Sequence, residues 1–204
     1  MFKKRVIIDT DYANKAHMKA LLLDRPTKMR FTLEDVRRMW DAGGFPDYPS
    51  IELIDGEVFE MPSDGWRTTN WNALVNRALV MGTDASVVVV PDKTLAVGED
   101  GLKPDFWLYP ASIDPQTVTG KDCLLVIEVS DTTLRWDIGR KASRYALGGV
   151  REYWVVDVEG RQVFVHRLRD DGTYGEPLVS DADEIVVPVL MPGLSFVLKD
   201  VVGE

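Results

Sequence analysis

Residues 123–130 read Cys-Leu-Leu-Val-Ile-Glu-Val-Ser, an apolar stretch of strand length that is interrupted by one acid, Glu128. Its apolar residues do not alternate with polar ones, which is typical of a strand covered by helices on both faces of a sheet. A carboxylate inside such a strand needs a cation, a metal ion or hydrogen-bond donors, because an unpaired buried charge is strongly destabilising. The stretch therefore predicts an α/β fold and identifies Glu128 as a candidate site residue.

A second acid precedes another strand-like segment. Pro104-Asp105 is followed by Phe-Trp-Leu-Tyr, and proline is tolerated at a strand start because it need not donate to the ladder. Carboxylates on adjacent strands can share one divalent cation, and magnesium typically combines one or two of them with water and phosphate oxygens. Asp105 and Glu128 therefore predict a magnesium site suited to phosphodiester hydrolysis. Pro91-Asp92-Lys93 is a rival for the first acid, but Asp92 lies in a turn-like stretch without such a strand after it.

Lys141 is the candidate cation beside that metal. It falls on a predicted helix directly after the Glu128 strand, and Ile138 and Tyr145 place it next to the sheet-facing apolar stripe. An ammonium group there would hold the attacking water or stabilise charge in the transition state. Two structural alternatives stay open. One is a surface pair of Lys141 with Asp137, worth about a few tenths of a kcal/mol, and the other is a purely structural pairing of Lys141 with Glu128.

The remaining segments predict the elements around these strands. Thr32 with Asp35 forms a capping-box signal for a helix that ends at Gly43-Gly44, and Asp55-Gly56 predicts a hairpin turn. The other predicted elements, in chain order, are hairpin strands 51–54 and 57–61, a helix 66–81 stopped by Gly82, strands 86–90, 94–97, 103–109 and 123–129 at the centre of a sheet with 98–101 as a turn, a helix from 131–133 to Leu147 closed by Gly148-Gly149, hairpin strands 152–157 and 162–168, and short edge strands after them.

Length and composition fit one globular domain, residues 29–204, behind an N-terminal arm, residues 1–28. No apolar run reaches the length of a membrane span, and the three apolar residues after Lys3-Lys4-Arg5 are too few for a signal peptide. The single cysteine, Cys123, excludes an internal disulfide and a cysteine-built zinc site. We therefore expect a cytoplasmic protein without membrane contact.

The net charge of -9 argues against a nucleic-acid-binding protein that relies mainly on basic groups contacting backbone phosphates. The basic residues are nevertheless concentrated, because residues 1–40 hold 10 Lys/Arg against 5 Asp/Glu and residues 131–151 hold 5 against 2. These two segments are either surfaces for an anionic partner or ordinary solvated faces, and the sequence leaves both interpretations open.

Five motifs occur in a fixed order between about Phe31 and Leu168: Glu52-Leu-Ile-Asp-Gly-Glu, Pro104-Asp105, Leu125-Val-Ile-Glu-Val-Ser, Asp137-Ile-Gly-Arg-Lys with Tyr145, and Gly149-Val-Arg-Glu-Tyr-Trp-Val-Val-Asp. This order resembles the Uma-two family, whose members are assigned as endonucleases of the PD-(D/E)XK superfamily. The resemblance implies a restriction-endonuclease-like mixed β-sheet flanked by helices, magnesium or manganese at the paired acids, and hydrolysis of DNA phosphodiesters that leaves a 5′-phosphate. Asp105 matches the motif's Asp and Glu128 its Glu.

Two positions depart from the pattern that the resemblance implies. Ser130 stands where the superfamily's usual strand lysine would be, so Lys141 would replace it from the helix as a migrated lysine. Residues 64–70, Asp-Gly-Trp-Arg-Thr-Thr-Asn, lack the histidine that often opens the helix in this family. The two histidines of the chain, His17 and His166, are interpreted as solvated or hydrogen-bonded side chains instead of catalysts.

The predicted metal-binding set is Asp105, Glu128, Val129 and Glu52, although hairpin acids such as Glu52 more often face solvent. Because cutting both DNA strands commonly uses two symmetry-related sites, a homodimer is also expected. The main alternative is a catalytically inactive nuclease-fold module that binds DNA or another protein. The sequence does not distinguish DNA from RNA as the substrate.

Substrate contacts are predicted for Arg140, Arg144 and Tyr145. For the aromatic residues Tyr145, Trp107 and Trp154, stacking on bases competes with packing in the core.

Overall fold

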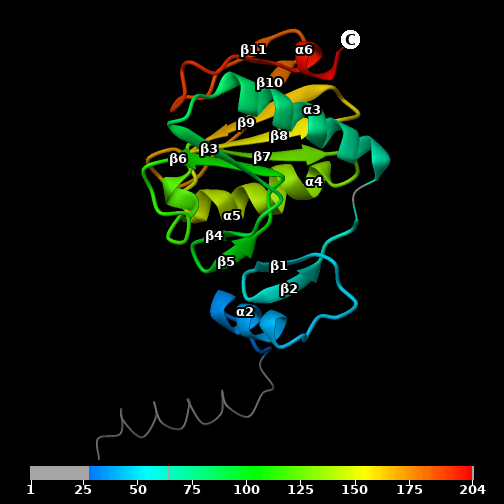
Figure 1. Ribbon diagram of the computed structural model, residues 1–204, viewed down its shortest axis with the longest axis vertical. Coiled ribbons are helices and arrows are strands. Elements are labelled where there is room, and N and C mark those ends of the chain that lie inside the picture. The colour runs from blue at the N-terminus through cyan, green and yellow to red at the C-terminus, as the bar shows by residue number, and fades with distance from the viewer. Residues whose placement is uncertain (1–27, 64, 204) are drawn as a thin grey trace, which may run out of the picture. The chain divides into compact units, whose positions relative to one another are not determined.

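The strand that carries Glu128 lies inside a six-stranded mixed sheet in the computed structural model, which describes residues 28–63 and 65–203 (Figure 1). This strand, β7 (Leu125–Ser130), is buried along its whole length. It pairs antiparallel with β6 (Phe106–Pro110) and parallel with β8 (Glu152–Asp157), in the sheet order β10-β9-β8-β7-β6-β3. Burial of every residue in β7 confirms the prediction made from its lack of alternating polar residues.

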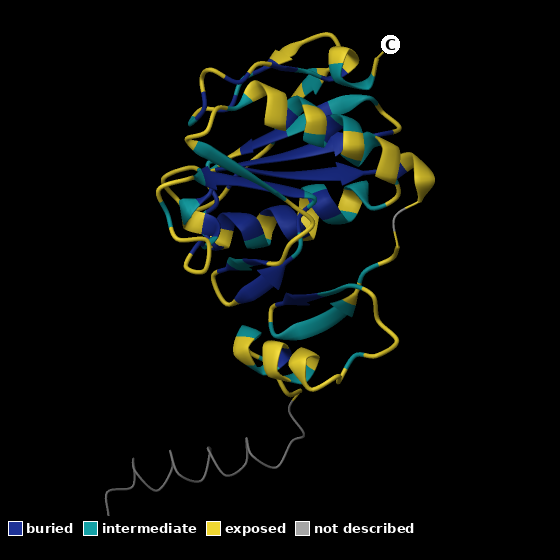
Figure 2. Cartoon of the chain, viewed as in Figure 1, coloured by how far each residue is buried: buried dark blue, intermediate teal, exposed yellow. Residues whose placement is uncertain are grey.

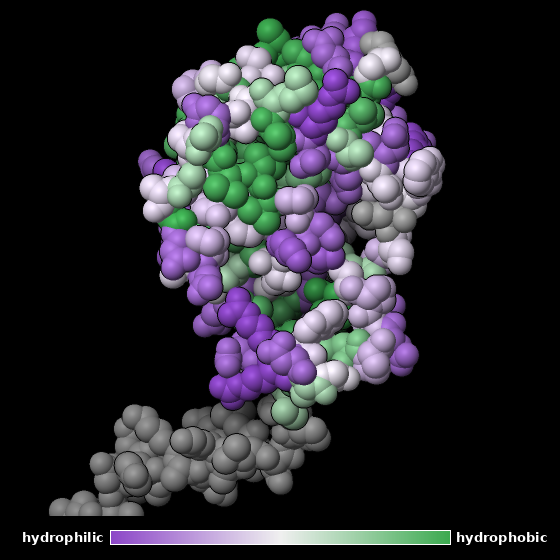
Figure 3. Space-filling model, viewed as in Figure 1, coloured by the Kyte–Doolittle hydropathy of each residue, from purple (hydrophilic) through white to green (hydrophobic). Residues whose placement is uncertain are grey.

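The outer strands complete this sheet. β8 forms the predicted hairpin with β9 (Gln162–Arg167), and β10 (Leu178–Asp181) follows as an edge strand. The opposite edge is β3 (Val87–Pro91), in which the four valines are half-buried. The space-filling view shows a hydrophobic area where Figure 1 draws β3 and β6 (Figure 3).

Helices cover both faces of the sheet, so that the buried strands lie between helices with exposed outer sides (Figure 2). On one face, α3 (Trp66–Gly82) contributes Val75 and Leu79 to a core cluster that also contains residues of α6 (Leu198–Val202). On the other face, α5 (Ala142–Leu147) contributes Tyr145 to a second cluster. The predicted mixed sheet flanked by helices is present. The sequence did not predict α6.

A second, four-stranded sheet has the order β2-β1-β5-β4. The hairpin of β1 (Ile51–Ile54) and β2 (Glu57–Glu60) confirms the prediction from Asp55-Gly56, and both turn residues have positive φ. β1 also pairs with β5 (Asp100–Leu102), which forms a hairpin with β4 (Leu95–Val97).

Three predictions about this region were wrong. Residues 98–101 are not all turn, because Asp100 and Gly101 belong to β5. The predicted strand 103–109 starts only at Phe106, and β4 lies in the second sheet instead of the central one. Gly101 explains part of the error: a Cβ at this position would collide with the Leu33 side chain, so the glycine permits close packing inside a strand and does not mark a turn.

The helix predicted after β7 is present but is not regular. It consists of α4 (Leu134–Trp136), a π-helical segment η2 (Asp137–Lys141) and α5, with Gly148 as the C-cap. Single π turns are frequent at functional sites. The turn that the sequence does not predict therefore carries the candidate lysine.

The remaining elements are short. The capping box of Thr32 and Asp35 is confirmed by both hydrogen bonds at the start of α2 (Leu33–Asp41). The others are η1 (Gly120–Asp122), β11 (Ile185–Val186) and β12 (Phe196–Val197). Phe31–Glu204 form one compact unit, whereas the predicted arm, apart from Lys28, falls outside the described residues. Among the helices described, none is long and apolar enough to cross a membrane.

Candidate active site

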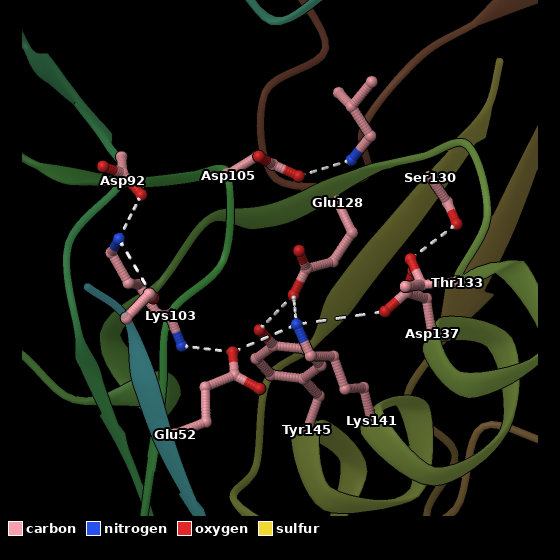
Figure 4. A network of polar contacts seen from close by, with 12 residues as sticks. Glu52, Asp92, Lys103, Asp105, Glu128, Ser130, Thr133, Asp137, Lys141 and Tyr145 are labelled. Carbon is pink, nitrogen blue, oxygen red and sulfur yellow. Dashed lines mark hydrogen bonds and ion pairs between the residues drawn. The ribbon is translucent and has the colours of Figure 1, made fainter. Parts of the chain in front are cut away.

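One cavity of about 260 Å³ brings the predicted acids and the predicted lysine together (Figure 4). We call it the acidic cavity. Its ionisable lining residues are Glu52, Asp92, Lys103, Asp105, Glu128, Asp137 and Lys141, and Val129 and Thr133 also line it. They come from β1, the segments before β6, strand β7 and the helix that follows it.

The strand register explains why Asp105 and Glu128 meet. Phe106 pairs with Ile127 and Trp107 with Val126 in the antiparallel β6–β7 ladder. One step further along the same register, Asp105 faces Glu128, and residues directly opposite each other project to the same side of a sheet. The convergence of the two acids that the sequence suggested is therefore a consequence of backbone pairing.

Asp105 is fixed by two hydrogen bonds. Its Oδ2 accepts from the main-chain N–H of Val129 at 2.7 Å, and its Oδ1 accepts from Asn72 Nδ2 at 2.8 Å. Asn72 lies on α3, and its own Oδ1 is buried without a hydrogen-bond partner among the described residues. Sequence analysis missed Asn72, because no local pattern distinguishes it from the other polar residues of that helix.

Lys141 is buried at the centre of the acidic cavity, with 4% of its side chain exposed. Its Nζ lies 2.9 Å from Glu128 Oε1, 3.0 Å from Glu52 Oε1 and 3.9 Å from Asp137 Oδ1. Burial opposes a charge on this lysine, but the three carboxylates outweigh that effect and raise the pKa of Lys141 above its ordinary value. The alternative of a surface pair with Asp137 is wrong, because both partners are buried and Asp137 is the most distant of the three acids.

Glu128 is surrounded by donors and by other acids. Its Oε1 accepts hydrogen bonds from Lys141 Nζ and from the Tyr145 hydroxyl, each at 2.9 Å. Burial is the main reason that the pKa of Glu128 is raised, and nearby Asp105, Asp137 and Glu52 add to the shift while Lys141 opposes it. The acidic cavity thus holds more negative charge than its lysines balance, an environment that favours an added cation.

Glu52 is buried, which contradicts the expectation that a hairpin acid faces solvent. Its Oε1 accepts from the main-chain N–H of Lys103 at 2.8 Å in addition to contacting Lys141. Its Oε2 is buried and has no hydrogen-bond partner in the described part of the chain. Within residues 28–63 and 65–203, no three His, Cys, Asp or Glu side chains are grouped so that they could hold a metal ion.

Ser130 takes part in a chain of hydroxyl groups. Its Oγ lies 3.2 Å from Thr133 Oγ1, which donates to Asp137 Oδ2 at 2.6 Å. The position where the resemblance implied a strand lysine is therefore used to hold Asp137, while a lysine enters the acidic cavity from η2 (Figure 4).

Asp92 and Lys103 form the outer part of the acidic cavity. Lys103 Nζ lies 2.6 Å from Asp92 Oδ1, and the Asp92 side chain is 77% exposed. Asp105, in contrast, faces Glu128 across the strand register and is tied to β7 by the Val129 N–H. The geometry favours Asp105 over Asp92 as the partner of Glu128.

None of the predicted substrate-binding residues lines the acidic cavity. Tyr145 is fully buried, so its ring cannot stack on a base. Arg144 donates to the buried Asp100, and Arg140 lies over the rings of Phe59 and Trp136.

The two tryptophans and the histidine are core residues. Trp107 and Trp154 are 6% and 0% exposed, in agreement with the packing interpretation. His166 is neither solvated nor hydrogen-bonded to any described residue, since it is 2% exposed beside Tyr153 and Tyr174 and neither ring nitrogen has a partner there. Burial lowers the pKa of His166 to about 4. His17 lies outside the described residues.

Comparison with solved structures supports the fold. A crystal structure described as "a putative nuclease belonging to DUF820" from Anabaena variabilis aligns with a TM-score of 0.68 and 16% identity, over 84% of this chain and 97% of that one. The type IIG restriction endonuclease BpuSI aligns with a TM-score of 0.35 and 17% identity, over 55% of this chain and 13% of its own, which is too weak to bear on the fold. No curated protein matches the chain in sequence.

The family assignment comes from the sequence as a whole. Residues 33–199 match the model of the Uma2 family, which is described as "Putative restriction endonuclease". This match confirms the resemblance carried by the five ordered motifs and agrees with the restriction-endonuclease-like arrangement of the sheet and helices. The chain therefore belongs to the Uma2 family.

Proposed function

We propose that this protein is a metal-dependent endodeoxyribonuclease that hydrolyses DNA phosphodiester bonds in the acidic cavity. The observation that carries the proposal is the placement of Glu128 opposite Asp105, with the Lys141 ammonium 2.9 Å from Glu128 in the same cavity. The description of the family and that of the Anabaena protein support this activity class.

The donor set fits a magnesium ion, with manganese as a substitute. Asp105 and Glu128 would hold it with the main-chain carbonyl of Val129. Glu52, whose buried Oε2 lacks a partner among the described residues, would have to shift toward the ion to become a third carboxylate ligand, because the three acids are not grouped closely enough as they stand. A bound ion of this kind polarises a phosphoryl oxygen and lowers the pKa of a coordinated water. An added cation would also offset the mutual repulsion that helps to raise the pKa of Glu128.

The protein's own groups would act through their fixed positions. Lys141 stays protonated among its acids, and its ammonium would orient the attacking water and stabilise negative charge on the phosphate. The Tyr145 hydroxyl holds Glu128 Oε1, while Asn72 and the Val129 N–H hold both oxygens of Asp105. Such a preorganised set of groups needs little rearrangement during the reaction.

A catalytically inactive DNA-binding or protein-interaction module is the second candidate. It is favoured by the contacts that Lys141 already makes to Glu128 and Glu52, because a closed ion-pair network is what purely structural acids would form. This candidate predicts that calorimetric titration of the folded protein with magnesium or manganese shows no binding.

Nicking of supercoiled plasmid tests the proposal. We expect cutting with magnesium or manganese, none with chelator, and none by Asp105→Asn or Glu128→Gln. Asp170→Asn, which removes an exposed acid outside the acidic cavity, is the matched control and should cut like the wild type. Equal cutting by all variants would show that the assigned acids are not the active site.

We further propose that the active form is a cytoplasmic homodimer, since two symmetry-related sites would cut both strands. Cys123 is free and buried, which fits a reducing compartment. Light scattering with and without duplex DNA measures the assembly.

A further inference from the structure

The acidic cavity needs a basic group that a phosphate can reach. Its lining holds five carboxylates and two ammonium groups, and DNA is a polyanion. Lys141 is assigned to the reacting phosphate, and because its side chain is 4% exposed and its Nζ contacts Glu128 and Glu52, a neighbouring phosphate of the same strand needs another basic group. Arg140 and Arg144 do not line the cavity.

Lys103 differs from Lys141 in exposure and in partners. Its side chain is 25% exposed, and its Nζ contacts Asp92 Oδ1 at 2.6 Å and Ser50 Oγ at 3.3 Å (Figure 4). Because the Asp92 side chain is 77% exposed, water screens this ion pair, which therefore contributes little to stability. A phosphate can therefore exchange with the Asp92 carboxylate at little cost.

The backbone of Lys103 is anchored to the site. Its N–H donates to Glu52 Oε1 at 2.8 Å, and Asp105 follows two residues later. Lys103 also lines a neighbouring hollow of about 520 Å³, whose other charged lining residues are Arg37, Lys93, Asp41 and Asp92. The Lys103 side chain thus lies between the acidic cavity and a hollow with a more basic lining, and the Lys103 main chain is hydrogen-bonded to Glu52.

Asp92 has a left-handed backbone, which aspartate adopts more readily than most non-glycine residues. Its φ is 50°, in the left-handed region, and its N–H donates to the main-chain oxygen of Asp105. This turn holds a carboxylate against Lys103 at the edge of the acidic cavity.

We propose that Lys103 binds a backbone phosphate of the DNA strand next to the acids, and that Asp92 occupies this phosphate position in the free protein. The inference rests on the proposed nuclease function, because it assigns a substrate contact to that site. It predicts opposite effects for the two partners: loss of the lysine weakens DNA binding, and loss of the competing carboxylate strengthens it.

Fluorescence anisotropy of a labelled duplex, with chelator present so that nothing is cut, tests the inference over a range of salt concentrations. Lys103→Met should weaken binding on the order of fivefold to tenfold and reduce the slope of log affinity against log salt by about 0.9, the value for one phosphate contact. Lys103→Arg should keep most of the affinity. Lys199→Met, which removes an exposed lysine on α6, should leave both quantities unchanged.

Asp92→Asn gives an independent test on an exposed residue, where loss of folding is not expected. Binding should tighten by up to about fivefold, and most of this gain should disappear in the Lys103→Met background. The inference is overturned if Lys103→Met changes affinity and salt slope no more than Lys199→Met does, if Asp92→Asn does not tighten binding, or if the wild type binds no DNA. Because the assay involves no cutting, a protein that binds as expected but nicks no plasmid would contradict the nuclease proposal alone.

Discussion

Replacing Lys141 with methionine tests the electrostatics of the acidic cavity most directly. Methionine fills a similar volume but leaves Glu128 and Glu52 without their shared cation, and their side chains are 6% and 0% exposed. Removing one partner of a buried ion pair costs about 3–5 kcal/mol, because the remaining charge is buried and unpaired. We therefore expect Lys141→Met to lower the free energy of unfolding by about 3–5 kcal/mol near pH 8.

The loss should shrink in acid. The pKa of Glu128 in the folded protein already lies above the ordinary value of 4.5, so the folded state binds more protons than the unfolded chain between these two values. The contribution of Glu128 to stability therefore rises as the pH falls through that window. Without Lys141, which opposes this shift, the window extends to higher pH, and the difference between variant and wild type should be smaller at pH 5.5 than at pH 8.

Urea unfolding at the two pH values measures these differences. The double variant Lys141→Met/Glu128→Gln should recover a large part of the loss, since a neutral amide replaces the unpaired carboxylate. Lys199→Met on α6 is the control and should stay within about 0.5 kcal/mol of the wild type. A cost below about 1 kcal/mol for Lys141→Met, or a double variant no more stable than the single one, would refute the reasoning.

Three further predictions concern metal, packing and pH. Magnesium at about one hundred times its dissociation constant should raise the unfolding free energy of the wild type by about 2.7 kcal/mol and that of Asp105→Asn by much less, as measured by urea unfolding. Gly148→Ala should cost about 1–3 kcal/mol, because the new Cβ would overlap the Val97 side chain and lie 3.0 Å from its main-chain carbon, whereas Gly139→Ala meets nothing within 4 Å and should not destabilise. His166 has a folded pKa of about 4, below its unfolded value of 6.5, so its contribution to stability is present above pH 6.5 and falls by about 3 kcal/mol as the pH drops to 4. His166→Phe should lack this part of the acid sensitivity in thermal melts.

Much of the fold follows from local patterns. The non-alternating, mostly apolar sequence of β7, the capping box of α2 and the Asp55-Gly56 turn each reflect short-range rules that tertiary contacts reinforce. The second sheet was not predicted, because β5 consists of Asp100, Gly101 and Leu102, whose composition suggests a turn. Its residues form a strand only because β1 and β4 lie on either side.

The site was only partly predictable, for a related reason. Glu128 and Asp105 stand out because a carboxylate in or next to an apolar strand conflicts with its surroundings, and that conflict is visible in the sequence. Asn72 and Lys103 are polar residues in segments where polar residues are common. Their importance comes from the packing of α3 against the sheet and of β1 beside residue 103, which are long-range contacts without a local signature.

The π-helical segment explains how a helix can supply the lysine that β7 lacks. In a regular α-helix of 3.6 residues per turn, positions four apart drift around the axis by only about 40° at each step, so Asp137, Lys141 and Tyr145 already lie on one face of the helix. A π turn holds more residues and cancels part of this drift, and all three side chains are buried. The Asp137 carbonyl accepts from the N–H of Ala142, five residues on, and from the Tyr153 hydroxyl at 3.2 Å, so the wider turn has its hydrogen bonds. Lys141 on η2 therefore lies next to the acids, in place of a lysine on β7. Ser130, at the strand position, instead contacts Thr133, whose hydroxyl donates to Asp137.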